Sequence, residues 1–285
     1  MNVLISGING FIGGDLMQLL TATADYNAYG ISRNTTTAAC DNIFAVDLAD
    51  ENSVTLFIEK IIKIPISFDV FVHCASVLAD AKNNRDFSLF TENTKITNNV
   101  VRIVNRLNIK TLVNLSTIGV YPNADGAYDE TTAIDPSKNF ECLYSLSKFC
   151  SEQLFNFYLL PDANVLNLRL SQVYGERMRE DRIYKIMENE MKQNNQITVW
   201  SNGERVSNFV EIEYVLKTIM HFINKPHSGL FNVGGENLSY KQLAEKVIST
   251  NQVEDIVVKL VNKGVISKVY INSDKLKNKL SNNKS

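Results

Sequence analysis

The chain has 285 residues, of which 45% are hydrophobic and 21% are charged. This composition excludes a disordered protein or a coiled coil, and it predicts one large domain with a smaller appendage. The formal net charge of −2 gives no basic footprint for nucleic acid or an anionic membrane surface, and no apolar run of about 18 residues could span a bilayer. We therefore expect neither a nucleic-acid partner nor a membrane partner.

The cysteines are scattered and form no CxxC pair; they are Cys40, Cys74, Cys142 and Cys150. This arrangement argues against a disulfide framework or a structural zinc site and fits a reducing cytosol. His221 and His227 have no other potential metal ligands near them in the sequence at a metal-binding spacing. We therefore expect a cytoplasmic protein without a metal centre.

Short apolar strands alternate with amphipathic helices over the first 170 residues. The predicted strands are 3–6, 28–32, one ending at 45–46, 69–73, 111–116 and 165–170. The predicted helices are 11–20, 51–62, 93–107 and 144–158. This alternation predicts an α/β fold with a doubly wound parallel sheet, a Rossmann fold, with helices on both faces.

The rhythm changes after Gly175. The predicted elements are a charged helix over 179–193, a strand at 197–200, a turn at Asn202-Gly203, a helix over 211–224, a strand at 230–233, a helix over 240–248 and a frayed tail over 275–285. We expect a dinucleotide-binding domain over 1–174 to which about 208–232 returns. The segments 175–207 and 233–285 would form a small α+β substrate domain.

A glycine-rich turn lies between the first predicted strand and helix. It contains Gly7, Asn9, Gly10, Phe11, Ile12 and Gly13. In the dinucleotide fingerprint, such glycines permit a tight turn, close approach of the backbone to a pyrophosphate and close helix–strand packing. The spacing here is GxxGxxG, a variant of that fingerprint, and the flanking strand and helix favour a dinucleotide site over a turn without ligand.

The residues after the second predicted strand bear on which dinucleotide binds. Arg33 follows this strand, and no carboxylate occurs until Asp41. A guanidinium suits a ribose 2′-phosphate, so we prefer NADP over NAD; the alternatives are that Arg33 stacks on adenine or is solvated. Asp47 and Leu48 follow the third predicted strand, where a carboxylate could accept the adenine amino group.

Tyr144 and Lys148 lie four residues apart, on one face of a predicted helix. A nearby cation lowers the pKa of a tyrosine, which otherwise lies near 10, and so prepares the phenol for proton transfer at neutral pH. Thr117 ends the fifth predicted strand, at the edge of a parallel sheet where ligands bind. Its hydroxyl could hold the oxygen that Tyr144 protonates.

Together these residues resemble the extended short-chain dehydrogenase/reductase family, which contains nucleotide-sugar epimerases, dehydratases and ketoreductases. The matching motifs run in the family's order: the three glycines, Asp47-Leu48, His73-Cys74-Ala75-Ser76, Asn93 with Thr97, Ser116-Thr117, Tyr144/Lys148, Arg169 before Val173-Tyr174-Gly175, Gly203 through Phe209-Val210, and Phe231-Asn232-Val233-Gly234. The resemblance implies that Tyr144 is the acid/base and that Thr117 binds the reacting oxygen. It also implies that Lys148 holds the nicotinamide ribose, with Ala75, Ser76 and Asn93 along the cofactor.

Departures from the family pattern argue against two of its activities. Ile118-Gly119 stands where the family's dehydratases carry Asp-Glu, so dehydration lacks its carboxylates. Gly119 stands where the bifunctional epimerase–reductases carry a cysteine, which argues against C3/C5 epimerisation. Gln172 replaces the usual asparagine of a substrate contact. Ser207 occupies the place of a diphosphate-binding arginine, a role that Arg205 could take instead if residues 205–207 form a strand.

The predicted function is therefore an NADPH-dependent reduction of a nucleotide-linked 4-keto sugar. The alternatives are a nucleotide-sugar C4 epimerase that retains NAD and, from another class, a dinucleotide-binding protein without chemistry. The resemblance also implies a homodimer that pairs through the helices near Asn93 and Tyr144.

Overall fold

The computed structural model describes residues 1–33 and 42–282, and clustering of their contacts divides them into two compact units. The first unit comprises Met1–Val120, Asp135–Arg169 and Leu216–Phe231; the second comprises Tyr121–Ile134, Leu170–Val215 and Asn232–Ser285. Tyr121–Ile134, which the sequence analysis assigns to the dinucleotide-binding domain, thus clusters with the second unit. Within the described residues, no helix combines the length and apolar character needed to cross a membrane.

The first unit is built on a seven-stranded sheet in the order β11-β7-β5-β4-β1-β2-β3. The strands are β1 (Asn2–Ser6), β2 (Asn27–Ser32), β3 (Ile43–Ala45), β4 (Val70–His73), β5 (Thr111–Thr117), β7 (Asn164–Leu170) and β11 (Gly229–Val233). The pairings between neighbours from β3 to β5 are parallel. The strand order reverses between β1 and β4, and such a switch point is where open α/β sheets bind ligands.

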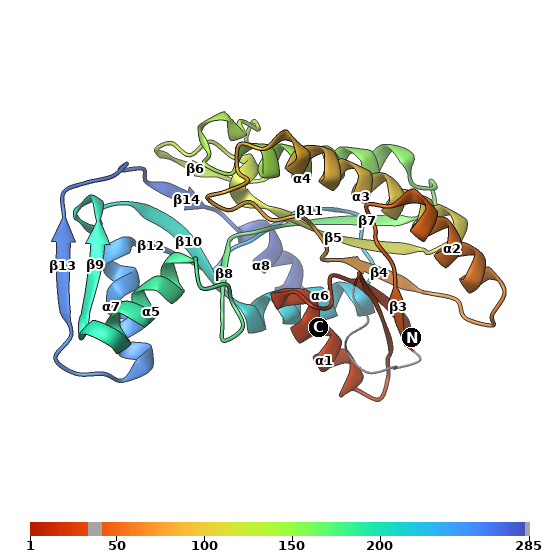
Figure 1. Cartoon of the computed structure of the whole chain (residues 1–285), viewed down its shortest axis with the longest axis horizontal. Coiled ribbons are helices and arrows are strands. Elements are labelled where there is room, and N and C mark those ends of the chain that lie inside the picture. The colour runs from red at the N-terminus through yellow and green to blue at the C-terminus, as the bar shows by residue number, and fades with distance from the viewer. Residues whose placement is uncertain (34–41, 283–285) are drawn as a thin grey trace. The chain divides into compact units, whose positions relative to one another are not determined.

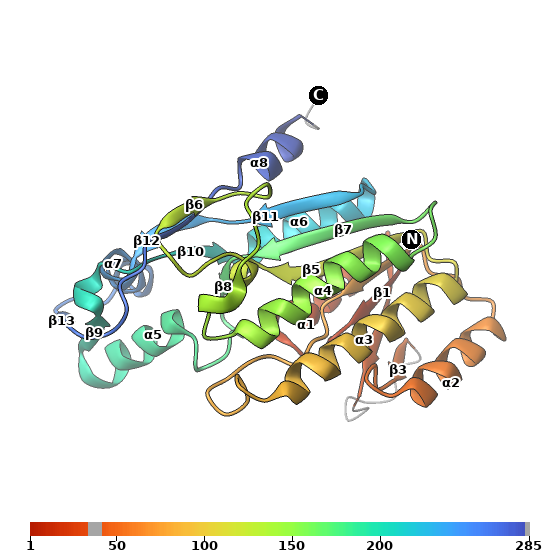
Figure 2. The same cartoon turned by 90° about the horizontal axis from the view of Figure 1, so that it is seen from above.

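Helices cover both faces of this sheet, with α2, α3 and α4 on one face and α1 and α6 on the other (Figures 1 and 2). The helices are α1 (Phe11–Thr21), α2 (Glu51–Ile62), α3 (Phe87–Arg106), α4 (Cys142–Tyr158) and α6 (Ile212–Asn224). Fully buried side chains such as Leu4, Phe71, Leu112 and Phe155 join the strands to the α2–α4 layer in one core. The architecture confirms the predicted α/β class with a doubly wound parallel sheet.

The second unit contains three small sheets, β12-β10-β8, β13-β9 and β14-β6. Their strands are β6 (Gly126–Tyr128), β8 (Gln172–Tyr174), β9 (Gln196–Trp200), β10 (Val206–Glu211), β12 (Glu236–Ser239), β13 (Val257–Val261) and β14 (Val269–Ile271). The helices are α5 (Ile183–Asn194), α7 (Tyr240–Asn251) and α8 (Asp274–Ser281). Of these strands, the sequence predicted only β9.

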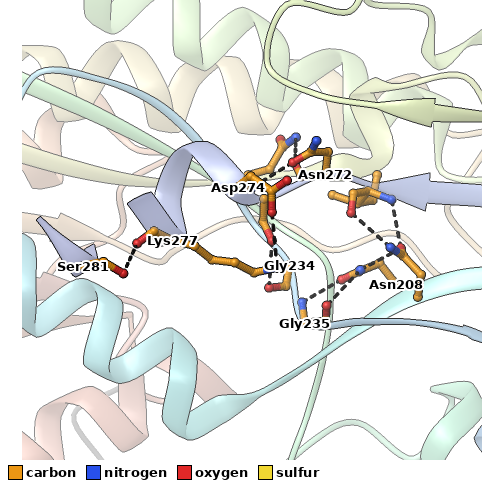
Figure 3. Close-up of polar contacts among 11 residues, drawn as sticks. Asn208, Gly234, Gly235, Asn272, Asp274, Lys277 and Ser281 are labelled. Atoms are coloured by element: carbon orange, nitrogen blue, oxygen red, sulfur yellow. Dashed lines mark hydrogen bonds and ion pairs between the residues drawn. The ribbon is translucent and has the colours of Figure 1, made fainter. Parts of the chain in front are cut away.

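Asparagine side chains connect the segments of the second unit. Asn208 on β10 accepts a hydrogen bond from the amide of Gly235 at 2.9 Å and donates to Oδ1 of Asn237 at 2.8 Å. Asn237 in turn accepts from the amide of Ile271 on β14 at 2.9 Å. Figure 3 shows this chain of contacts with Asn208, Gly235 and Asn272 labelled. The side chains thus link β10, β12 and β14, which are distant in sequence.

Three predicted elements differ most from the structure. The helix predicted over 93–107 begins at Phe87, because the Asp86 carboxylate accepts from the amide of Ser88 and caps an earlier turn. The helix predicted over 179–193 begins at Ile183. The tail predicted to fray forms α8 as far as Ser281, because the fully buried Leu276 packs this helix against the rest of the chain.

Candidate active site

The glycine turn joins β1 to α1 and is shaped by close backbone packing. Gly7 has φ of +73°, which favours glycine, and a Cβ on it would lie 2.9 Å from the amide nitrogen of Ala75. A Cβ on Gly13 would lie 2.4 Å from the carbonyl oxygen of Gly7, so only glycine lets α1 pack this close to β1. Asn9 and Gly10 are exposed at the tip, with Phe11 and Ile12 half-buried behind them.

The start of α1 fits a pyrophosphate. Gly10 is the N-cap and no side chain caps the helix, and the first turn contains no acidic residue. The free amides of a first helical turn attract an anion, and an acidic side chain would compete with it. The residues present therefore fit a dinucleotide phosphate group at this place.

The ends of β2 and β3 lie beside this turn in the sheet order. Asn9 donates a hydrogen bond to Oγ of Ser32 at 2.7 Å, which connects the turn to the residue before Arg33. Arg33 is exposed, while Asp41 lies outside the described residues. The Asp47 carboxylate accepts from the amide of Ala49 at 2.9 Å, and Leu48 is buried.

The loop after β4 contains Ala75 and Ser76, both half-buried. Asn93 on α3 fixes this loop, because its Oδ1 accepts from the amide of Val77 at 2.8 Å and its Nδ2 donates to the carbonyl of Val77 at 3.0 Å. Both ends of the Asn93 amide are thus engaged with backbone. The structure gives Asn93 a role in shaping the loop, beside the cofactor contact that the resemblance implies.

α4 packs against the end of β5 and the 3-10 turn at Ile118–Val120 that follows it, so the segments that carry Thr117, Tyr144 and Lys148 meet. The Thr117 hydroxyl oxygen accepts from the amide of Gly119 at 3.0 Å. Tyr144 is half-buried, whereas Lys148 is only 4% exposed. An ammonium buried one helical turn from the phenol has the charge that favours a phenolate.

Burial lowers the pKa of Lys148 to about 8, while the nearby Glu152 carboxylate acts in the opposite direction. Glu152 lies one turn further along α4 and accepts from Oγ of Ser116 at 2.5 Å and from Nε and Nη2 of Arg169 at 2.9 and 2.7 Å. Glu152 and Arg169 are 1% and 3% exposed. The ion pair joins α4 to β7, and the hydrogen bond from Ser116 adds β5, so the three elements that meet near Lys148 are connected. Sequence reasoning missed Glu152, although its position four residues after Lys148 on the same helix face was the available signal.

Gln172 and Arg205 belong to the second unit, where they share neighbours. Gln172 donates to Oγ of Ser207 at 2.8 Å, and the Arg205 guanidinium stacks over the Tyr240 ring at 5.5 Å. Burial raises the pKa of Tyr240, while Arg205 and a hydrogen bond with Gln172 lower it. The Nε atom of Arg205 is buried without a hydrogen-bond partner. The structure thus brings these two predicted substrate residues around one tyrosine.

Acidic, cysteine and histidine side chains do not gather as a metal-binding group anywhere in the described parts of the chain.

Comparison with known proteins identifies the family of this chain. Residues 3–234 match the model of the NAD dependent epimerase/dehydratase family, and the chain belongs to this family. It is 25% identical over 268 residues to an uncharacterized UDP-glucose epimerase of Bacillus subtilis (strain 168), covering 90% of this chain and 82% of that protein. It is 30% identical over 162 residues to GDP-6-deoxy-D-talose 4-dehydrogenase of Aggregatibacter actinomycetemcomitans, covering 55% of this chain and 48% of that protein.

Among solved structures, the fold matches UDP-glucuronic acid 4-epimerase from Bacillus cereus in complex with UDP-glucuronic acid and NAD. The TM-score is 0.80 at 19% identity, over 99% of this chain and 93% of that one. This likeness confirms the fold, and the family match confirms the resemblance drawn from the ordered motifs.

Proposed function

We propose that the protein is an NADPH-dependent reductase of a nucleotide-linked 4-keto sugar. The observation that carries the assignment of an oxidoreductase is the buried Lys148 on the helix that presents Tyr144 and packs against β5. The choice of a reductase rests on Arg33 after β2, because a guanidinium there favours NADP. Tyr144 delivers a proton to the substrate oxygen, which Thr117 orients. Lys148 stabilises the negative charge that the phenol then carries.

The cofactor supplies the hydride when it is bound, and the chain supplies its position. The residues that would hold it are the glycine turn with Gly7, Asn9, Gly10, Phe11, Ile12 and Gly13, then Arg33, Asp47, Leu48, Ala75, Ser76, Asn93 and Lys148. Arg33 directly follows β2, and the sequence has no carboxylate after it until Asp41. A guanidinium without a competing carboxylate favours a 2′-phosphate and therefore NADP. The NADPH pool in cells is kept reduced, as a reductase requires.

At the substrate end, Arg205 and Gln172 would hold the nucleotide-linked part. The guanidinium of Arg205 has an unpartnered, buried Nε, and the substrate diphosphate would supply the acceptor. β10 begins at Val206, so Arg205 precedes the strand and does not share a strand face with Ser207 as the sequence analysis supposed. Its proposed role therefore rests on the unpartnered Nε.

A second candidate is a C4 epimerase that retains NAD and returns the hydride to the opposite face of the sugar. It is favoured by the match, over 90% of this chain, to an uncharacterized UDP-glucose epimerase. Tyr144, Lys148 and Thr117 would serve both reactions, so these residues do not separate them.

We also propose a cytoplasmic homodimer that pairs through α3 and α4. Phe157 is 80% exposed on α4, and Phe87 on α3 is 64% exposed. Covering such side chains stabilises an association. Light scattering of the purified protein that gave only monomer would contradict the dimer.

The deciding experiment measures cofactor consumption. The purified protein is denatured and any released dinucleotide is quantified, and NADPH oxidation is then followed with nucleotide-linked 4-keto sugars. A reductase oxidises one NADPH per product and carries little dinucleotide through purification. Stoichiometric retained NAD, with C4 epimers interconverting and no net NADPH loss, would overturn the reductase in favour of the epimerase.

A further inference from the structure

A buried serine–histidine pair lies at the switch point of the first unit's sheet. Ser6 ends β1, His73 ends β4, and the two residues are register partners across the parallel pairing. Oγ of Ser6 and Nδ1 of His73 are 2.8 Å apart, and the two residues are 0% and 1% exposed. None of the roles proposed above uses either side chain.

The hydrogen bonds around Ser6 fix the position of one proton. Its hydroxyl oxygen accepts from the amides of Cys74 and Ala75, both at 3.2 Å, and these fill the two acceptor positions of a hydroxyl. The single hydroxyl hydrogen must then be donated to Nδ1 of His73. An imidazole that accepts at Nδ1 carries its proton on Nε2 and is neutral.

We infer that His73 is a positioning residue: as a neutral imidazole protonated at Nε2, it orients the Ser6 hydroxyl, which holds the loop 74–76 in the place that the dinucleotide requires. This inference rests on the proposed function for the identity of the ligand, whereas the tautomer does not depend on it. The same loop meets the glycine turn, since a Cβ on Gly7 would lie 2.9 Å from the amide nitrogen of Ala75. A shift of the loop 74–76 by a fraction of an ångström would therefore disturb the glycine turn as well as the dinucleotide contacts of the loop.

The surroundings support a neutral ring. The pKa of His73 lies well below its usual value, first because of burial and then because of Lys148 on α4. Burial also raises the pKa of Cys74, the next residue, to about 12, so this thiol brings no negative charge that would offset a second cation. Glu152, the anion that acts on Lys148, is already paired with Arg169. A protonated His73 would thus add a cation beside Lys148 and would lose its bond from Ser6.

The first test reads the tautomer directly. The chain has three histidines, so the ring nitrogen signals can be assigned with His221→Gln and His227→Gln variants and ¹⁵N–¹H spectra. We expect an unprotonated Nδ1 and a protonated Nε2 for His73, unchanged from pH 7.5 to pH 6. A proton on Nδ1, or titration near the ordinary histidine value of about 6.5, would overturn the inference.

The second test reads the positioning. Ser6→Ala should speed hydrogen exchange at the amides of Cys74 and Ala75 and raise the dissociation constant for dinucleotide about tenfold, with turnover at saturating cofactor within about threefold. His73→Asn offers Oδ1 as an acceptor in place of Nδ1, and its dissociation constant for dinucleotide should stay within about threefold of wild type. His73→Phe offers no acceptor and should weaken binding as Ser6→Ala does. Phe71→Leu, on the same strand, controls for loss of packing.

The outcomes separate the two proposals. Wild-type protein that binds no dinucleotide defeats the proposed function and, with it, the positioning role, while the tautomer result stands on its own. Ser6→Ala protein that binds dinucleotide as tightly as wild type defeats the positioning role alone. The same conclusion would follow if Phe71→Leu weakened binding as much as Ser6→Ala does.

Discussion

The two units differ in the kind of polar group that they bury. In the first unit the buried side chains include Lys148, Glu152 and Arg169, which are charged; among the described residues of the second unit the buried polar side chains are serines and asparagines. A buried charge is costly unless it is paired, so a fold retains it where chemistry needs it. The network around Asn208 contains only neutral groups, so burying it costs less and it can serve structure alone, by connecting β10, β12 and β14.

Removing the phenol oxygen tests whether the buried cation serves chemistry. We expect Tyr144→Phe to lower turnover about 10³-fold, near the middle of the range for losing a general acid, with dinucleotide affinity changed less than about threefold. Initial rates and binding titrations measure both. Tyr158→Phe, on the same helix but 65% exposed, is the matched control and should retain full turnover. Equal rates for the two variants would mean that the charge in the first unit has no catalytic purpose.

Breaking the ion pair tests the cost of that charge. Glu152→Gln leaves Arg169 buried without its counter-charge, and we expect a loss of about 3–5 kcal/mol in the free energy of unfolding. Urea denaturation measures it. Glu51→Gln breaks the pair with Arg102, in which Glu51 is 75% exposed, and should cost less than about 1 kcal/mol. Equal losses for the two variants would mean that burial adds nothing to the cost of breaking an ion pair in the first unit.

The neutral network should be less sensitive. Asn208→Ala leaves the amide of Gly235 without an acceptor, and we expect a loss of about 1–3 kcal/mol by the same measurement. Asn208→Asp keeps the acceptor for Gly235 but buries an unpaired carboxylate against Oδ1 of Asn237, so it should cost at least as much as Asn208→Ala. Asn251→Ala, which removes a bond within α7, should change stability by less than about 0.5 kcal/mol. A cost for Asn208→Ala above that of Glu152→Gln would reverse the comparison.

The two units also differ in how far the sequence predicts them. In the first unit, strands β1, β3 and β4 are each followed directly by a helix, so apolar runs and helical periodicity locate them. Helix α2 has the predicted bounds. In the second unit, β14 pairs with β6 and β13 with β9, and partners so distant in sequence leave no local periodic signal. The short strand β14 has only three residues in which to show a pattern.

The candidate site follows the same division. Tyr144 and Lys148 are four residues apart on one helix, and the glycine turn is contiguous, so both were predicted from local spacing together with the order of the neighbouring elements. Ser6 and His73 are partners only because β1 and β4 are adjacent in the sheet, and Arg169 reaches Glu152 from β7. Such pairings depend on the tertiary fold and could not be predicted from either segment alone.

The smallest expected effect concerns the end of β2, where the first unit presents charge on its surface instead of burying it. If Arg33 binds a 2′-phosphate, Arg33→Ala should weaken NADP binding about tenfold or more and leave NAD binding within about twofold, because only NADP carries the charged group. Arg33→Lys should lose part of this preference, since an ammonium keeps the charge without the bidentate geometry. Calorimetric titration of both dinucleotides measures the ratio, and Arg85→Ala, also exposed, controls for general loss of positive charge. Equal weakening of both dinucleotides would place Arg33 on the adenine that they share, and no change in either would leave it in solvent; in both cases the reductase would lose its argument for NADPH while the site around Tyr144 kept its own.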